Sequence, residues 1–138
     1  MPLLDTVFAF FFAHLVGDYF LQSSWMALRK THSSWAAGVH AATYGIPFLI
    51  FSPTLAAWSF IVVTHFFIDR FQLAKYLVYA QSYLGPASWR RPWADCRVTG
   101  HLREELGGPP MWMARWLYII VDNSAHLALN FVALAYID

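Results

Sequence analysis

Histidine and aspartate recur one helical turn apart in this sequence. The pairs are His14 with Asp18 in HLVGD, His65 with Asp69 in HFFID and, in reverse order, Asp122 with His126 in DNSAH. Residues four apart share one face of a helix. Imidazole and carboxylate are ligands for zinc, manganese and iron, and a pair at this spacing can bind one ion from one face. The pairs therefore predict a metal site.

His40 extends the set, with Tyr44 one turn further along the chain. The predicted metal ligands are His14, Asp18, His40, His65, Asp69, Asp122 and His126. The set is too large for one tetrahedral ion, so two divalent ions sharing a carboxylate, as in di-metal helix bundles, are one version of the prediction. In the alternative version these groups only hydrogen-bond to one another.

We predict further roles for other polar residues and for one of the candidate ligands. We expect Asp18 to act as a general base, because one carboxylate need not be fully engaged by metal. Tyr44 and Arg70 are candidate substrate-binding residues, Arg70 through a phosphate at the membrane interface. Packing explains Tyr44 equally well, and Arg70 can simply extend toward the lipid headgroups. Hydrogen bonds between helices are expected from Gln22, Asn123 and Asn130.

The elements that would position these residues are apolar helices. The chain has 138 residues, of which 59% are hydrophobic and only 12% are charged, the profile of an integral membrane protein. Segments at about 3–25, 35–51, 54–80 and 112–137 are long enough to cross a bilayer. We therefore predict an all-α integral membrane protein, a four-span helical bundle forming a single domain over residues 1–138.

The basic residues predict the orientation of the spans. They follow the first span or lie between the end of the third span and the start of the fourth. The positive-inside rule places both regions in the cytoplasm, so both termini lie on the non-cytoplasmic side. The cytoplasmic loop at about 84–111 contains Trp89 and Trp93, which favour the membrane interface. In this topology each paired Asp lies nearer the cytoplasm than its His.

Composition also excludes some classes of protein. A net charge of +1 gives no basic field for nucleic acid. The single cysteine, Cys96, excludes an internal disulfide and a cysteine-based zinc site. The first apolar run has no preceding basic residue and no cleavage site after it, so we expect a retained helix rather than a signal peptide.

The four segments also share a pattern with a known family. The stretches AHLVGDYFLQSSWMALRK, HAATY, THFFIDRFQLAK and DNSAH resemble an uncharacterised bacterial membrane family, the domain of unknown function 3307. The shared pattern is His-Leu-x-x-Asp-Phe-x-Leu-Gln with a following Lys, then His before Tyr, His-x-x-x-Asp before Lys, and Asp-x-x-x-His. Tyr19 replaces the usual Phe, and Arg70 and Lys75 replace a tighter Asp-Arg-x-Lys. The pattern is also similar to that of predicted membrane-bound metal-dependent hydrolases.

These observations predict a multi-pass protein of the bacterial inner membrane, with the lipid bilayer as its main partner. The expected activity is metal-dependent hydrolysis of a phosphate ester or lipid-like substrate at the cytoplasmic leaflet. One alternative is an accessory subunit of a larger membrane complex that holds pigment, haem or metal. A second alternative is ion or proton transport through the His and Asp layer, which four spans would support only in a homo-oligomer.

Overall fold

The structure, a computed structural model, describes residues 3–137 and the side chains of residues 6–137. Every regular element in this range is helical, which confirms the predicted all-α class. Contacts divide the chain into two compact units, Met1–Gln72 with His126–Asp138 and Leu73–Ala125. Each unit is described by itself below.

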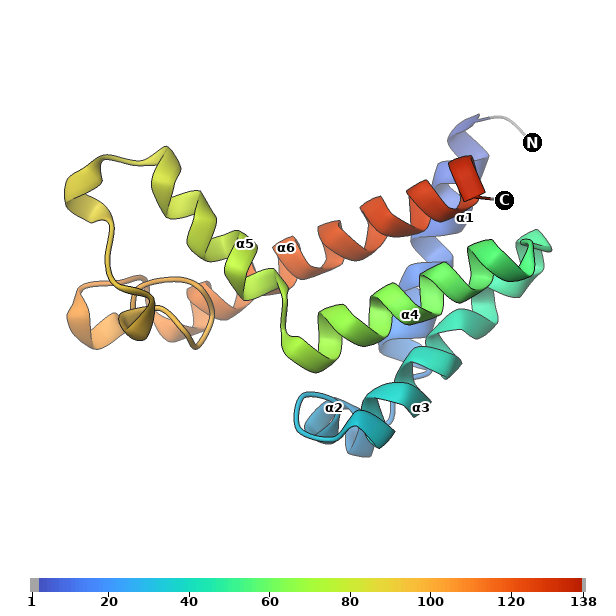
Figure 1. Cartoon of the computed structure of the whole chain (residues 1–138), viewed down its shortest axis with the longest axis horizontal. Coiled ribbons are helices and arrows are strands. Elements are labelled where there is room, and N and C mark those ends of the chain that lie inside the picture. Colours follow the sequence, from blue (N-terminus) through green and yellow to red (C-terminus); the bar gives the residue numbers. More distant parts are fainter. Residues whose placement is uncertain (1–2, 138) are drawn as a thin grey trace. The chain divides into compact units, whose positions relative to one another are not determined.

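Four helices and the C-terminal part of a fifth build the described part of the first unit (Figure 1). They are α1 (Leu3–Leu15) with a π-helical turn (Val16–Phe20), α2 (Ser24–Arg29), α3 (Ser34–Gly45) with a 3-10 segment (Ile46–Phe51), α4 (Leu55–Phe71), and the part of α6 (Met111–Val132) from His126 onward with a π-helical turn (Ala133–Ile137). Helices α3 and α4 are antiparallel and lie side by side. The side chains of Ser23, Ser33 and Thr54 cap α2, α3 and α4 by accepting backbone N–H groups.

One stripe of α4 faces the interior of this unit. Ala57, Ile61, His65 and Asp69 follow one another at four-residue intervals, and all are buried. The apolar end of the stripe belongs to a core with Ala13, Tyr44, Phe48 and Ala133. The same stripe therefore begins in an apolar core and ends in ionisable groups.

Two glycines allow the helices around these groups to approach closely. A Cβ on Gly17 would lie 2.7 Å from the carbonyl oxygen of Tyr44, so no side chain fits where the π-helical turn meets α3. A Cβ on Gly45 would lie 2.6 Å from a methyl group of Val62 on α4. Small residues at helix contacts bring backbones together, and here they set the spacing around His40 and Asp18.

The predicted third segment, 54–80, is two helices. Helix α4 ends before Gln72, which has φ 51°, and its N–H bonds back to the carbonyl oxygen of Asp69. A left-handed residue at this position terminates a helix, and α5 (Ala74–Gln81) follows. The predicted first segment, 3–25, is also interrupted, because the helix stops at Phe20 and α2 starts at Ser24.

The second unit contains α5, several 3-10 turns between Ser82 and Leu106, and the part of α6 up to Ala125. Trp93 stacks on Tyr76 with ring centroids 4.9 Å apart, whereas Trp89 is exposed. Arg103 forms an ion pair with Asp95 at 3.2 Å. This unit contains the predicted interfacial loop, and its membrane placement stays a prediction.

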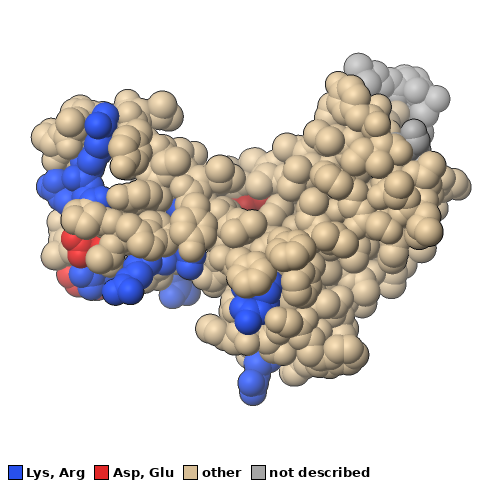
Figure 2. All heavy atoms as spheres, viewed as in Figure 1, with Lys and Arg blue, Asp and Glu red and all other residues tan. Residues whose placement is uncertain are grey.

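Among the described residues, one helix is long and apolar enough to cross a membrane, Met111–Ile137. A shorter apolar helix covers Thr6–Phe20. Large apolar side chains are exposed on other helices too, including Phe12, Ile50 and Leu55. Figure 2 shows a face on which Lys and Arg gather in patches and most of the remaining surface is uncharged. Four spans and a single domain remain predictions.

Candidate metal site

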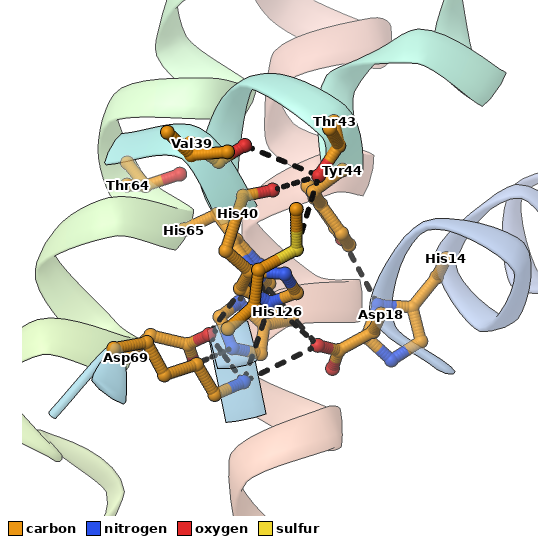
Figure 3. A network of polar contacts seen from close by, with 12 residues as sticks. His14, Asp18, Val39, His40, Thr43, Tyr44, Thr64, His65, Asp69 and His126 are labelled. Carbon is orange, nitrogen blue, oxygen red and sulfur yellow. Dashed lines mark hydrogen bonds and ion pairs between the residues drawn. The ribbon is translucent and has the colours of Figure 1, made fainter. Parts of the chain in front are cut away.

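Ionisable side chains from separate helices meet inside the first unit. Asp18 comes from the π-helical turn, His40 from α3, His65 and Asp69 from α4, and His126 from α6. All of them are buried, and their side chains point toward one another (Figure 3). The sequence pattern predicted each of these residues, and the fold brings them together.

Four ligand atoms form the tightest group: Nε2 of His40, Nε2 of His65, Oδ1 of Asp18 and Oδ2 of Asp69. His40 Nε2 lies 3.0 Å from His65 Nε2, 3.1 Å from the Asp69 oxygen and 3.2 Å from the Asp18 oxygen. His65 Nε2 lies 3.2 Å from the Asp69 oxygen and 3.8 Å from the Asp18 oxygen. Every atom in the group lies within 4.8 Å of the others.

These separations fit the coordination shell of a single metal ion. Zinc bonds of about 2.0–2.2 Å to nitrogen and oxygen place neighbouring ligand atoms of a tetrahedron about 3.3–3.6 Å apart. The three distances among His40, His65 and Asp69, from 3.0 to 3.2 Å, lie a few tenths of an ångström below this range. Two contacts within the four-residue group, His40 with His65 and His40 with Asp18, are also hydrogen bonds. A shared cation would neutralise the two carboxylates as well.

Asp18 stands slightly apart from the other three residues. Its oxygen is 3.8 Å from His65 Nε2, which is longer than the separations among the other three ligand atoms. His40, His65 and Asp69 thus form a compact set of two imidazoles and one carboxylate, the ligand set of open catalytic sites such as His₂Glu zinc enzymes. All four side chains remain candidate ligands of one ion, and Asp18 differs only in its longer separation from His65.

His126 forms hydrogen bonds with two of these candidate ligands, and its own predicted role as a ligand stays a prediction. Its Nε2 lies 3.3 Å from Asp69 Oδ1, and its Nδ1 lies 3.1 Å from His65 Nδ1. An ionised carboxylate only accepts, so His126 Nε2–H donates to it, and Nδ1 of a neutral His126 accepts from His65. His65 then keeps the lone pair of Nε2 for a metal. Hydrogen bonds of this kind fix the tautomer of metal-binding histidines.

Tyr44 joins His14 to the cluster. The hydroxyl of Tyr44 lies 2.9 Å from His14 Nδ1 and accepts from Asn130 Nδ2 at 2.5 Å. The Tyr44 ring stacks on His65 with centroids 3.6 Å apart. Tyr44 therefore connects His14 to the candidate ligands, and Asn130 forms the expected hydrogen bond between helices. A ligand role of His14 stays a prediction. A direct contact of Tyr44 with substrate stays a prediction.

Lys30 is the residue that the site prediction missed. Its Nζ lies 2.7 Å from Asp69 Oδ2, 3.3 Å from His40 Nε2 and 3.7 Å from Asp18 Oδ1. Lys30 follows α2, twelve positions after Asp18 in the sequence, so no helical spacing connects the two. The only signal in the sequence was the Lys that follows the first motif in the resemblance.

Arg70 and Asp122 lie outside the group of four candidate ligands formed by Asp18, His40, His65 and Asp69. Arg70 donates from Nη1 to the carbonyl oxygen of Thr31 at 2.7 Å and from Nε to Ser34 Oγ at 3.2 Å, which ties the end of α4 to the start of α3. Its substrate role stays a prediction. Asp122 lies on α6 in the second unit, half-buried. A second metal ion that uses Asp122 likewise stays a prediction.

The remaining reactive side chains lie elsewhere. His32 is exposed. In the second unit, burial lowers the pKa of His101 and raises the pKa of the Cys96 thiol. A thiol with a raised pKa is a poor nucleophile at neutral pH. None of these three residues belongs to a group of candidate metal ligands among the described residues.

A family match covers most residues of the candidate metal site. A family model described as a protein of unknown function, DUF3307, matches residues 6–105. The chain belongs to the DUF3307 family. The DUF3307 match contains Asp18, Lys30, His40, His65 and Asp69, whereas His126 and Asn130 lie beyond it. No curated protein and no solved structure gives a significant match.

Proposed function

We propose that this DUF3307 protein is a membrane-embedded, metal-dependent hydrolase. The observation that carries the proposal is the compact triangle of His40, His65 and Asp69 with Asp18 beside it. Two imidazoles and one carboxylate leave further coordination positions for water and substrate. A closed, structural metal site would instead need four equivalent protein ligands.

Each residue has a distinct part in the proposed reaction. A divalent ion held by His40, His65 and Asp69 would supply Lewis acidity to water and to a phosphoryl or acyl oxygen. Asp18 would accept the proton from the attacking water, because its carboxylate borders the ligand set. Burial of both carboxylates keeps bulk water away, which strengthens electrostatic interactions in the site.

Metal content tests the proposal directly. We expect the protein purified in detergent to retain about one equivalent of a divalent transition metal, and a His65→Ala, Asp69→Ala double variant to lose it. His32→Ala is the matched control, since His32 is exposed outside the cluster. Less than about half an equivalent in the wild type, unchanged in the double variant, would refute the metal site.

Activity tests the second half of the proposal. The metal-loaded protein should cleave a chromogenic phosphate ester in mixed micelles, and a chelator should abolish cleavage until metal is restored. Asp18→Asn should keep the metal and lose turnover. Full metal occupancy with no hydrolysis of phosphate or acyl esters would leave a metal-holding subunit of a membrane complex as the better description.

We also propose that the chain crosses the membrane four times. The segments 3–20, 34–51 and 55–71 are each about 26 Å long at 1.5 Å per residue, close to the thickness of a thin hydrocarbon core. Polar groups lie inside the first unit, and Phe12, Ile50 and Leu55 lie outside, the arrangement that lipid favours. Thr54 Oγ1 donates to the carbonyl oxygen of Ile137 at 3.5 Å, which supports one membrane side for the turn at 51–54 and the C-terminal end.

A further inference from the structure

Lys30 adds a positive charge to the cluster and so changes its net charge. Asp18 and Asp69 carry two negative charges and Lys30 carries one positive charge, so these three groups sum to −1. A divalent ion changes the sum to +1. A buried site with surplus positive charge attracts an anion strongly, because little water is present to compensate it. This step rests on the proposed function.

Lys30 is also the charged member of the cluster that solvent reaches most easily. Its side chain is 18% exposed, compared with 6% for Asp18 and 4% for Asp69. Arg29 precedes Lys30 and is exposed. Arg70 donates a hydrogen bond to the carbonyl oxygen of Thr31, the residue that follows Lys30. A ligand that enters past Lys30 therefore meets positive charge before it meets the metal ligands.

We propose that Lys30 binds the anionic group of the substrate and that this group is a phosphate. The ammonium contacts Asp69, His40 and Asp18 through atoms that border the metal position, so an anion held by Lys30 would also lie within reach of the ion. Lysine is a common point-charge partner of phosphate, and metal ions polarise phosphoryl oxygens. The substrate class is thus a phosphate ester, either a lipid headgroup or a water-soluble molecule.

Titration calorimetry on the zinc-loaded protein in detergent tests this role. Orthophosphate should bind the loaded wild type about tenfold or more tightly than the chelator-treated protein. In Lys30→Met, phosphate affinity should fall about tenfold or more, the effect of one charge-assisted hydrogen bond. Lys30→Arg should restore most of it. Arg97→Met, which removes an exposed charge in the second unit, should match the wild type.

Metal affinity gives an independent readout in the same variants. Lys30 places positive charge beside the ion, so zinc should bind Lys30→Met about fivefold more tightly than the wild type. A purely structural Lys30 would instead weaken zinc binding when it is lost, and this result would overturn the proposal. Unchanged phosphate affinity in folded Lys30→Met would overturn it as well, while leaving the metal site intact.

Further probes define the anion. Acetate bound as tightly as orthophosphate would overturn the phosphate class. Short-chain phosphatidic acid bound about tenfold more tightly than orthophosphate would identify a lipid headgroup as the source, and equal affinities would identify a water-soluble ester. If Lys30→Met fails to fold, Lys30→Gln, which keeps a polar side chain without the charge, takes its place, and wild-type phosphate affinity in that variant overturns the proposal. Equal phosphate binding of the wild type with and without zinc contradicts the charge argument. Failure of the wild type to bind zinc at all refutes the proposed function and this inference together.

Discussion

Tyr44 stacks on His65 with ring centroids 3.6 Å apart and an interplanar angle of 11°. The same side chain uses its hydroxyl to hold His14 and Asn130. One aromatic residue on α3 thus fixes a candidate metal ligand on α4 and connects it to polar groups on α1 and α6. Its ring and its hydroxyl have separable effects.

Tyr44→Phe should preserve metal binding and lower stability. The ring still stacks on His65, but the buried Asn130 amide loses its acceptor, which costs about 1–3 kcal/mol. Tyr44→Leu removes the stack as well and should also weaken zinc binding. Thermal unfolding in detergent and zinc titration of both variants separate the two effects. Equal zinc affinity in Tyr44→Leu and the wild type would argue against a role of the ring in orienting His65.

The two aspartates should respond differently to the same change. Asp69→Asn removes a ligand of the compact triangle and should reduce bound metal to a small fraction of the wild-type value. Asp18→Asn should keep most of the metal, because Asp18 Oδ1 lies further from His65, at 3.8 Å, and should lower kcat about 100-fold or more. Metal content by mass spectrometry and turnover of a phosphate ester give the two readouts. Similar metal loss in both variants would make Asp18 a fourth ligand.

Close helix contacts predict opposite effects of alanine at two glycines. Gly17→Ala places a Cβ against the backbone of Tyr44 and should destabilise the protein by about 1–3 kcal/mol. Gly38→Ala is the matched control within α3, since a Cβ there would meet no atom of the described residues within 4 Å beyond its own helix, and helix propensity favours alanine there by about 0.5–1 kcal/mol. Unfolding in denaturant measures both. A neutral Gly17→Ala would show that the π-helical turn can move away from α3.

Metal removal should lower stability through linkage. A ligand that binds only the folded state at 100 times its Kd stabilises that state by about 2.7 kcal/mol. Addition of zinc to the apo-protein should therefore raise the melting temperature, and a His65→Ala, Asp69→Ala double variant should show no increase. His32→Ala should behave as the wild type. A zinc-induced increase that persists in the double variant would place the bound metal elsewhere.

The predicted topology is open to cysteine labelling in intact cells. In a Cys96→Ser background, Ser52→Cys should react with an impermeant maleimide added outside the inner membrane, and Ser88→Cys should react only after lysis. Both serines are exposed, and the positive-inside rule places residues 84–111 in the cytoplasm. Labelling of both positions from the same side would contradict the four-span arrangement.

The candidate residues of the site could be predicted from local sequence patterns. The spacing of His14 with Asp18 and of His65 with Asp69 is a local property, because a helix places residues four apart on one face whatever surrounds it. The same local pattern indicated helices, and the structure confirms an all-α chain. The family resemblance followed from the same motifs, and the DUF3307 match confirms it.

The grouping of these residues depends on packing between helices that are distant in the sequence. Tyr44 meets Asn130 across 86 positions, and His65 meets His126 across 61, separations that carry no periodic signal in one sequence. Packing at Gly17 and Gly45 sets which helices approach, and the left-handed residue Gln72 ends α4 where apolar sequence continues. The same long-range packing brings Lys30, which directly follows the short helix α2, to the cluster. Charge neutralisation of buried carboxylates depends on position in space and not on spacing along the chain.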